Sequence, residues 1–273
     1  MSSQKSNLRA LLLVILILII ILAVVISFSQ FTFKKEYPPP TSLQALLPRF
    51  RLIDMDKAGI ETDRDKDGIN DQEDIMLGAK KQLADPAVNI FSEGVDEPNY
   101  YNGGDPPLGF ALCTDIIARA FKEAGFDLMQ LVDDDITENF YEYPLQKIWG
   151  QRYPDANIDY RRIQNLEVFF ARNAEELNIT FKPEDTDNLV QWLPGDIAFF
   201  DMDKDGHTDN CGIISDFTTR KGIPKIIYNY IDPGYTVEID ILGQSVITGH
   251  YRYPGKTTGN TGSDSENIEE AGG

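Results

Sequence analysis

The sequence predicts an α+β domain, because helical patterns come first along the chain and strand patterns follow them. Three segments place apolar residues at helical spacing, residues 75–82, 113–124 and 163–176. Four later segments are rich in β-branched and aromatic residues and are predicted strands, residues 196–200, 211–216, 225–230 and 245–253. We therefore expect helices packed on an antiparallel sheet.

Composition divides the chain into five segments. Residues 11–27 form an unbroken apolar run, long enough to cross a hydrocarbon core of about 30 Å as a helix. No small-residue cleavage site follows this run, so we expect a retained single-pass anchor with the rest of the chain outside the cell membrane. The five predicted segments are a transmembrane anchor at 1–28, a proline-rich linker at 29–50, an Asp-rich module at 51–75, a globular domain at 76–254 and a disordered tail at 255–273.

Charge and cysteine content limit the partners and the redox chemistry. The formal net charge of −19 disfavours nucleic acid as a partner, because phosphate binding needs a basic surface. The two cysteines do not define a disulfide framework. Adjacent side chains of a strand point to opposite faces. If residue 210 faces a site, Cys211 faces the core, so we expect two free thiols.

Cys113 lies at the start of the second predicted helix. A loop rich in glycine and proline precedes it, and Ile116, Ala120 and Phe121 give this helix an apolar face. In a first helical turn, the helix dipole and the unpaired backbone N–H groups favour a thiolate and can hold an oxyanion. Papain-like hydrolases place their nucleophile in this way. The alternative is a buried cysteine that serves only as a small apolar side chain.

Four segments of the globular domain carry a family resemblance. They contain Gly-Gly-Asp-Pro-Pro leading to Cys-Thr-Asp at 103–115, Asn-Ile-Asp-Tyr-Arg-Arg at 157–162, Pro-Gly-Asp-Ile with Gly-Ile-Ile-Ser-Asp at 194–216, and Thr-Gly-His-Tyr-Arg-Tyr at 248–253. In order and spacing they resemble the bacterial family called domain of unknown function 1287, which is similar to NlpC-type, papain-like cysteine peptidases. The resemblance implies a papain-like fold and an envelope hydrolase of amide or peptide bonds, with peptidoglycan as a candidate substrate.

The histidines that this resemblance implies are replaced. The residue that would act as base to the cysteine is Asn210, and the other two positions hold Tyr228 and Tyr160. An asparagine cannot take a proton from a thiol, so a Cys–His pair is missing from the expected register.

Three interpretations of Cys113 therefore stay open. His207 could act as the base from the adjoining loop, with Asn210 orienting it, or His250 could do so from the last predicted strand. In the third interpretation, the protein is a degenerate member of the family that binds a ligand without cleaving it. The candidate catalytic residues are Cys113, His207, Asn210, Tyr228 and His250.

Two acidic loops suggest calcium sites. Alternating aspartates around a glycine turn supply the oxygens that Ca²⁺ requires. The first loop carries Asp63, Asp65, Asp67, Asp71 and Asp74 and resembles the Asp-rich repeats of thrombospondin type 3. The second carries Asp201, Asp203, Asp205 and Asp209 but has no carboxylate at its twelfth position, so a tight hairpin turn without metal is the alternative. A cation in the second loop would fix the segment that positions His207 and Asn210.

Paired arginines suggest a site for a carboxylate. Arg161 and Arg162 follow Asp159 directly before a predicted helix, and arginines clamp carboxylates through two hydrogen bonds. Peptidoglycan stem peptides end in carboxylates, so these residues, together with Asp105 of the resembling segment, are candidates for substrate binding. The alternative is a structural ion pair with the predicted helix that contains Asp115.

Overall fold

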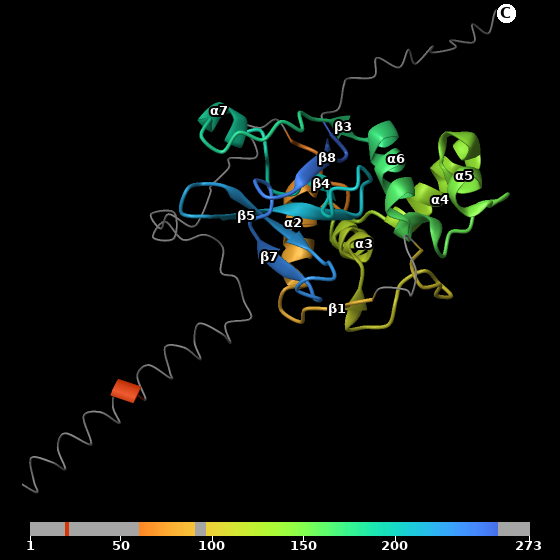
Figure 1. Cartoon of the computed structure of the whole chain (residues 1–273), viewed down its shortest axis with the longest axis horizontal. Coiled ribbons are helices and arrows are strands. Elements are labelled where there is room, and N and C mark those ends of the chain that lie inside the picture. The colour runs from red at the N-terminus through yellow and green to blue at the C-terminus, as the bar shows by residue number, and fades with distance from the viewer. Residues whose placement is uncertain (1–19, 22–59, 91–96, 256–273) are drawn as a thin grey trace, which may run out of the picture. The chain divides into compact units, whose positions relative to one another are not determined.

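Within the described residues, six antiparallel strands form one sheet in the spatial order β3-β8-β4-β5-β6-β7 (Figure 1). The computed structural model describes residues 20–21, 60–90 and 97–255. This arrangement confirms the prediction of an α+β domain. The strands are β3 (Glu175–Glu176), β4 (Ile197–Asp201), β5 (Asn210–Thr218), β6 (Pro224–Tyr228), β7 (Val237–Ile239) and β8 (Val246–Arg252), and a separate parallel pair is formed by β1 (Val88–Asn89) and β2 (Phe110–Ala111).

The helices precede most of the strands, and α3 is central among them. It contacts both α2 and the sheet strand β5. Gly78 of α2 allows a close approach, since a Cβ there would lie 2.7 Å from the carbonyl oxygen of Ala120 on α3. Figure 1 shows α4, α5 and α6 grouped on one side of the molecule. The helices are α2 (Asp71–Lys81), α3 (Cys113–Glu123), α4 (Leu128–Asn139), α5 (Leu145–Trp149), α6 (Ile163–Asn173) and α7 (Thr186–Leu189), with 3-10 turns η1 (Phe140–Glu142) and η2 (Asp159–Arg161).

Several element boundaries differ from the sequence prediction. α2 begins at Asp71 and not at residue 75, because the side chain of Asn70 caps it by accepting from the Glu73 backbone N–H. The Asp-rich segment therefore continues into a helix of the globular domain. α6 ends at Asn173, and the residues that follow pair as β3 with the edge of β8. α4, α5, α7 and β7 were not predicted.

The two faces of the sheet carry different cores. Phe199 and Ile213 lie in the core that faces α3, whereas Ala198 and Phe200 lie in a second core that includes Trp192. Cross-strand partners share a face of an antiparallel sheet. Away from the register shifts beside Phe199 and after Ile214, this alternation fixes the side-chain directions on β5 and β8, including those of Asn210, Cys211 and His250.

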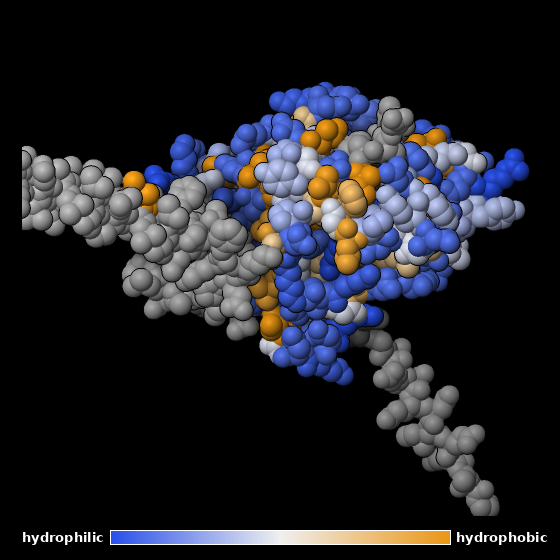
Figure 2. Space-filling view, turned by 90° about the horizontal axis from the view of Figure 1, so that it is seen from below, coloured by the Kyte–Doolittle hydropathy of each residue, from blue (hydrophilic) through white to orange (hydrophobic). Residues whose placement is uncertain are grey.

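The face drawn in Figure 2 carries mainly hydrophilic residues, with small groups of apolar residues between them. Such a mixture is ordinary for a surface that contacts water.

No helix in the described part of the chain is long and apolar enough to cross a membrane. The predicted anchor at 11–27 lies outside the described residues, apart from Ile20 and Ile21, which are helical. The linker at 29–50 and the tail from residue 256 onward lie outside them as well.

Candidate functional site

Cys113 is the first residue of α3, as predicted. Leu112 precedes it in an extended conformation, and its backbone N–H donates to Oδ2 of Asp115 at 2.8 Å. This bond satisfies a donor at the helix start and fixes the entry of the chain into the helix. Cys113 is 8% exposed and is a free thiol.

Cys113 lines a cavity of about 190 Å³. The cavity lies where the α3 start meets the acidic loop before β5 and the segment after β6. Its polar lining consists of Asn89, Glu97, Cys113, Thr114, Arg161, Asp203, Asp209, Asn229 and Tyr230. The sequence prediction of site residues did not include five of these residues: Asn89, Glu97, Thr114, Asn229 and Tyr230. A strand end followed by polar residues was the only available signal for Asn229 and Tyr230.

Cys211 lies on the same side of the sheet as Cys113. It pairs with Phe199, so it belongs to the core that faces α3. Burial raises the pKa of the Cys211 thiol well above its ordinary value, and a hydrogen bond with the Cys113 thiol raises it further. Cys211 thus faces the core and both cysteines are free thiols, as expected, but this core is the one that also contains Cys113.

Asn210 points away from Cys113. It pairs with Phe200, which belongs to the second core. Its Oδ1 accepts from the Cys211 backbone N–H at 2.8 Å, while its Nδ2 is buried without a partner. The prediction that residue 210 lies across from the thiol is wrong, because β5 begins at Asn210 in a register that turns this side chain to the other face. Tyr228 also belongs to that second core.

Neither imidazole lines the cavity. His207 is exposed in the acidic loop, where its backbone N–H donates to Asp205. His250 is fully buried and pairs with Ala198 on the face away from α3. The chain has only these two histidines.

His250 belongs to a buried charge network. Its Nε2 lies 3.0 Å from Oδ2 of Asp196, and its ring stacks on Trp192 with the centroids 4.0 Å apart. Arg252 donates to both oxygens of Asp196, at 2.7 and 2.8 Å. Burial alone would raise the pKa of Asp196, but the hydrogen bonds from His250 and Arg252 outweigh it and lower this pKa. His250 thus stabilises the sheet and is excluded as a base for Cys113.

Asp209 and Tyr230 form a polar pair in the cavity. The Tyr230 hydroxyl donates to Oδ2 of Asp209 at 2.9 Å. Burial raises the pKa of Asp209, although hydrogen bonds from the Met202 backbone and from Tyr230 oppose the rise. Burial and the bond to Asp209 also raise the pKa of Tyr230. A carboxylate with a raised pKa is a better proton acceptor than an ordinary one.

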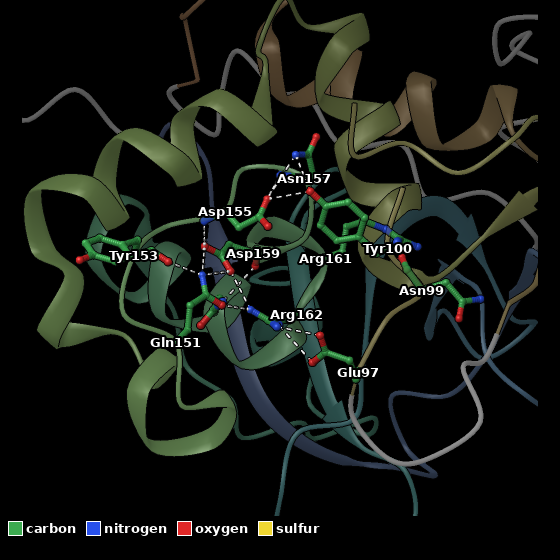
Figure 3. Close-up of polar contacts among 11 residues, drawn as sticks. Glu97, Asn99, Tyr100, Gln151, Tyr153, Asp155, Asn157, Asp159, Arg161 and Arg162 are labelled. Atoms are coloured by element: carbon green, nitrogen blue, oxygen red, sulfur yellow. Dashed lines mark hydrogen bonds and ion pairs between the residues drawn. The ribbon is translucent and has the colours of Figure 1, made fainter. Parts of the chain in front are cut away.

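The candidate arginines are held by internal partners (Figure 3). Arg161 and Asp115 are both fully buried, and they share two hydrogen bonds of 2.7 and 2.9 Å. Arg162 donates to Asp159 at 2.8 Å and to Glu97 at 2.7 Å (Figure 3). These bonds confirm the alternative of a structural ion pair with the helix that contains Asp115. They also occupy the guanidinium groups that a substrate carboxylate would need.

Asp105, the fourth candidate for substrate binding, is also paired internally. It accepts from Arg119 at 2.7 Å near the surface.

The two acidic loops have the same backbone turn. In the first, Oδ1 of Asp63 accepts from Lys66 at 2.7 Å and its Oδ2 accepts from Gly68 at 3.0 Å. In the second, Asp201 accepts from Lys204 and Gly206 at the same two distances. The carboxylate oxygens of Asp63, Asp65 and Asp67 lie within 4.8 Å of one another, as do those of Asp201, Asp203 and Asp209.

Asp74 distinguishes the first loop from the second. It is 6% exposed, and its Oδ2 is buried without a hydrogen-bond partner. Burial raises the pKa of Asp74 to about 7, and the charges of Asp67, Asp65, Asp63 and Asp71 add to the rise. The equivalent position of the second loop is Gly212.

The fold and the site define an α+β protein with a free thiol at the start of its central helix. The model of the family described as "Domain of unknown function (DUF1287)" matches residues 89–253, more than half of the chain. The chain belongs to this family, which confirms the family resemblance. It is 35% identical over 179 residues to "Uncharacterized protein YijF" of Escherichia coli (strain K12), a match that covers 66% of this chain and 80% of the relative. No solved structure matches the chain.

Proposed function

We propose that this protein is a membrane-anchored binding module of the cell envelope, which holds an amine-bearing peptide in the Cys113 cavity. The observation that carries the proposal is the absence of both imidazoles from the cavity lining. Without an imidazole near Cys113, the thiol lacks the partner that activates a papain-type nucleophile. The cavity is nevertheless present, and a thiol, amides and carboxylates line it.

The charge of the cavity determines which ligand it favours. Arg161 is neutralised by Asp115, and Glu97 is paired with Arg162, which it shares with Asp159. In the described part of the chain, Asp203 and Asp209 form no ion pair with a lysine or arginine. Their corner of the cavity favours a positive group, such as the amine of a peptidoglycan stem peptide.

We include in this proposal a papain-like fold and a location at the cell membrane. A helix that starts at a cysteine and packs on an antiparallel sheet supports the likeness to NlpC-type peptidases. The apolar run at 11–27 supports a membrane anchor. Ca²⁺ in the loop of Asp201, Asp203, Asp205 and Asp209 remains a prediction; there it would compete with the ligand amine for the same carboxylates.

A thiol hydrolase is the second candidate function, and Asp209 favours it. In this mechanism Asp209 takes the thiol proton while Sγ of Cys113 attacks an amide carbonyl carbon. The proton then passes to the leaving amine as the C–N bond breaks, and water hydrolyses the thioester to release the acid and restore the thiol. The backbone N–H of Cys113 in the first turn of α3 would donate to the oxyanion, since the Leu112 N–H already donates to Asp115.

Binding of a stem peptide to the full chain in detergent distinguishes the two functions. We expect calorimetry to show that acetylation of the peptide amines weakens binding at least tenfold in the wild type, because the charge attraction is lost. Asp209→Asn should weaken binding of the free-amine peptide, and Cys113→Ala should retain it. Equal binding of the two peptides would overturn the proposed ligand.

Mass spectrometry of the same mixtures tests hydrolysis. The binding proposal expects an intact peptide after prolonged incubation. Cleavage by the wild type that is lost in Cys113→Ala would overturn it and establish the hydrolase.

A further inference from the structure

The loop from Asp63 to Asp74 is a preformed ring of oxygens. The carboxylates of Asp63, Asp65 and Asp67 converge within 4.8 Å. Lys66 and Gly68 adopt left-handed conformations, with φ of 64° and 95°, which bend the chain around this point. Carboxylates packed this closely repel one another unless a cation lies between them.

Asp74 provides independent evidence for a ligand. It lies in the first turn of α2 and is more than nine-tenths buried, and one of its carboxylate oxygens has no partner. Asp74 lies one helical turn after Asp71, whose Oδ1 accepts from the Arg64 backbone N–H of the loop at 2.7 Å, so both carboxylates belong to the helix face that meets the loop. A buried carboxylate oxygen without a partner is costly, and native structures almost always satisfy such groups.

We propose that Asp63, Asp65, Asp67 and Asp74 bind one Ca²⁺ ion. The first three ligands come from the loop, and Asp74 is the ligand from α2. The donor set consists of oxygens, which hard cations prefer, and neither histidine nor cysteine belongs to it. Ca²⁺ accepts six to eight oxygens in a flexible geometry, whereas Mg²⁺ demands a near-ideal octahedron. A loop with a short aspartate as its last ligand belongs to the weak, extracellular end of the calcium range, about 10⁻⁴–10⁻³ M.

The site would clamp the Asp-rich segment onto the end of α3 that is far from Cys113. Nε of Arg64 donates to the Gly125 carbonyl at 3.0 Å, and its guanidinium lies 4.7 Å from the centre of the Phe126 ring. Gly125 and Phe126 follow the C-terminus of α3, while Cys113 is its first residue. An α-helix rises about 1.5 Å per residue, so roughly 15 Å of helix separates the cation from the thiol. The ion is therefore expected to stabilise the fold without entering the cavity.

Calcium titration of the full chain in detergent tests the site. We expect calorimetry to give binding in the range of about 10⁻⁴–10⁻³ M, and about 5 mM Ca²⁺ to raise the melting temperature by about 4 °C. Asp74→Asn keeps the shape of the side chain but removes its charge, and it should weaken binding at least tenfold. The matched control is Asp85→Asn, which changes an exposed aspartate outside both loops and should leave binding unchanged.

Three outcomes would overturn the proposal. The first is no calcium heat and no thermal shift at about 5 mM. The second is an equal thermal shift with Mg²⁺, which would indicate general screening of the acidic surface. The third is unchanged binding in Asp74→Asn together with its loss in Asp203→Asn, which would place the ion in the other loop. None of these measurements depends on the ligand of the Cys113 cavity.

Discussion

The two acidic loops adopt one turn in two different surroundings. Asp63 and Asp201 accept the same backbone hydrogen bonds at the same distances. The first loop ends in α2, whose first turn carries the buried carboxylate of Asp74. The second ends in β5, where the corresponding residue is Gly212, and two of its aspartates line the Cys113 cavity. A short acidic motif thus specifies the turn. The helix or strand that follows determines whether the twelfth position carries a carboxylate.

The largest expected effect comes from giving the second loop the carboxylate that it lacks. A Cβ at Gly212 would lie 2.5 Å from Cγ2 of Ile226 and 2.8 Å from the Ile227 carbonyl oxygen. We expect Gly212→Asp to destabilise the protein by about 5 kcal/mol or more, from overpacking and from the burial of a charge. Urea unfolding measures the loss, with Gly212→Ala as the steric control. A folded variant that binds Ca²⁺ more tightly would show that only the ligand, and not the strand, distinguishes the loops.

The next largest loss of stability is expected at Asp196, which attaches the first loop to the core. Gln72, in the first turn of α2, donates to Oδ1 of Asp196 at 2.6 Å, so the first loop is joined to the buried network of His250 and Arg252. Removal of one partner from a buried ionic network typically costs about 3–5 kcal/mol. We expect Asp196→Asn to lose about 3 kcal/mol at neutral pH, as measured by urea unfolding.

The pH dependence of this loss has a definite sign. The folded-state pKa of Asp196 lies below its ordinary value of 3.8, because hydrogen bonds from His250 and Arg252 outweigh burial. The stability that the ionised carboxylate contributes is therefore fully present above about pH 4 and is lost as the pH falls through the lower folded-state pKa. The difference between wild type and Asp196→Asn should be constant from pH 7 to 5 and shrink below about pH 4. A difference that grows toward acid would contradict the assignment.

These contrasts show what the sequence could and could not specify. The start of α3 at Cys113 was predictable, because a Gly/Pro loop meets a helical apolar pattern there. The directions of Asn210 and Cys211 were not predictable, since a shift of one residue in the pairing register of β5 exchanges the two faces. α4 was missed although Leu128, Val132 and Ile136 are buried at helical spacing, because charged residues between them weaken the pattern.

Long-range pairs were harder still to predict. Nothing local indicates that Asp196 meets His250 and Arg252, because the pairing depends on how distant elements pack. The pair of Asp115 and Arg161 was predicted only as an alternative to substrate binding. The presence of Asn229 and Tyr230 in the cavity lining also depends on how distant elements pack.

The reactivity of Cys113 should depend on the second loop and not on the first. Asp209 lines the same cavity, and its charge opposes the anionic thiolate that reacts with iodoacetamide. We expect Asp209→Asn to speed labelling of Cys113 at pH 7.5 by roughly three- to tenfold, about 1 kcal/mol of electrostatic free energy. Peptide mapping by mass spectrometry measures the rate at Cys113 separately from Cys211.

Two further variants complete the labelling test. Asp67→Asn, in the first loop, should leave the rate unchanged within twofold. Asn210→His should also leave it unchanged, because this side chain belongs to the opposite face of the sheet. Faster labelling in Asn210→His would mean that residue 210 reaches the thiol, and slower labelling in Asp209→Asn would support Asp209 as the base of a hydrolase.

The smallest expected effect tests whether the two turns are equivalent. Lys66 and Lys204 occupy the same position of their loops and have nearly equal φ angles, 64° and 65°. A residue other than glycine in this conformation costs roughly 1–2 kcal/mol, whereas glycine loses about 0.5–1 kcal/mol of backbone entropy on folding. We therefore expect Lys66→Gly and Lys204→Gly each to stabilise the metal-free protein by about 0.5 kcal/mol, measured by urea unfolding in a chelator. Equal gains would establish one backbone geometry for both loops. A gain at Lys204 alone would show that the first loop adopts this turn only when a cation is bound.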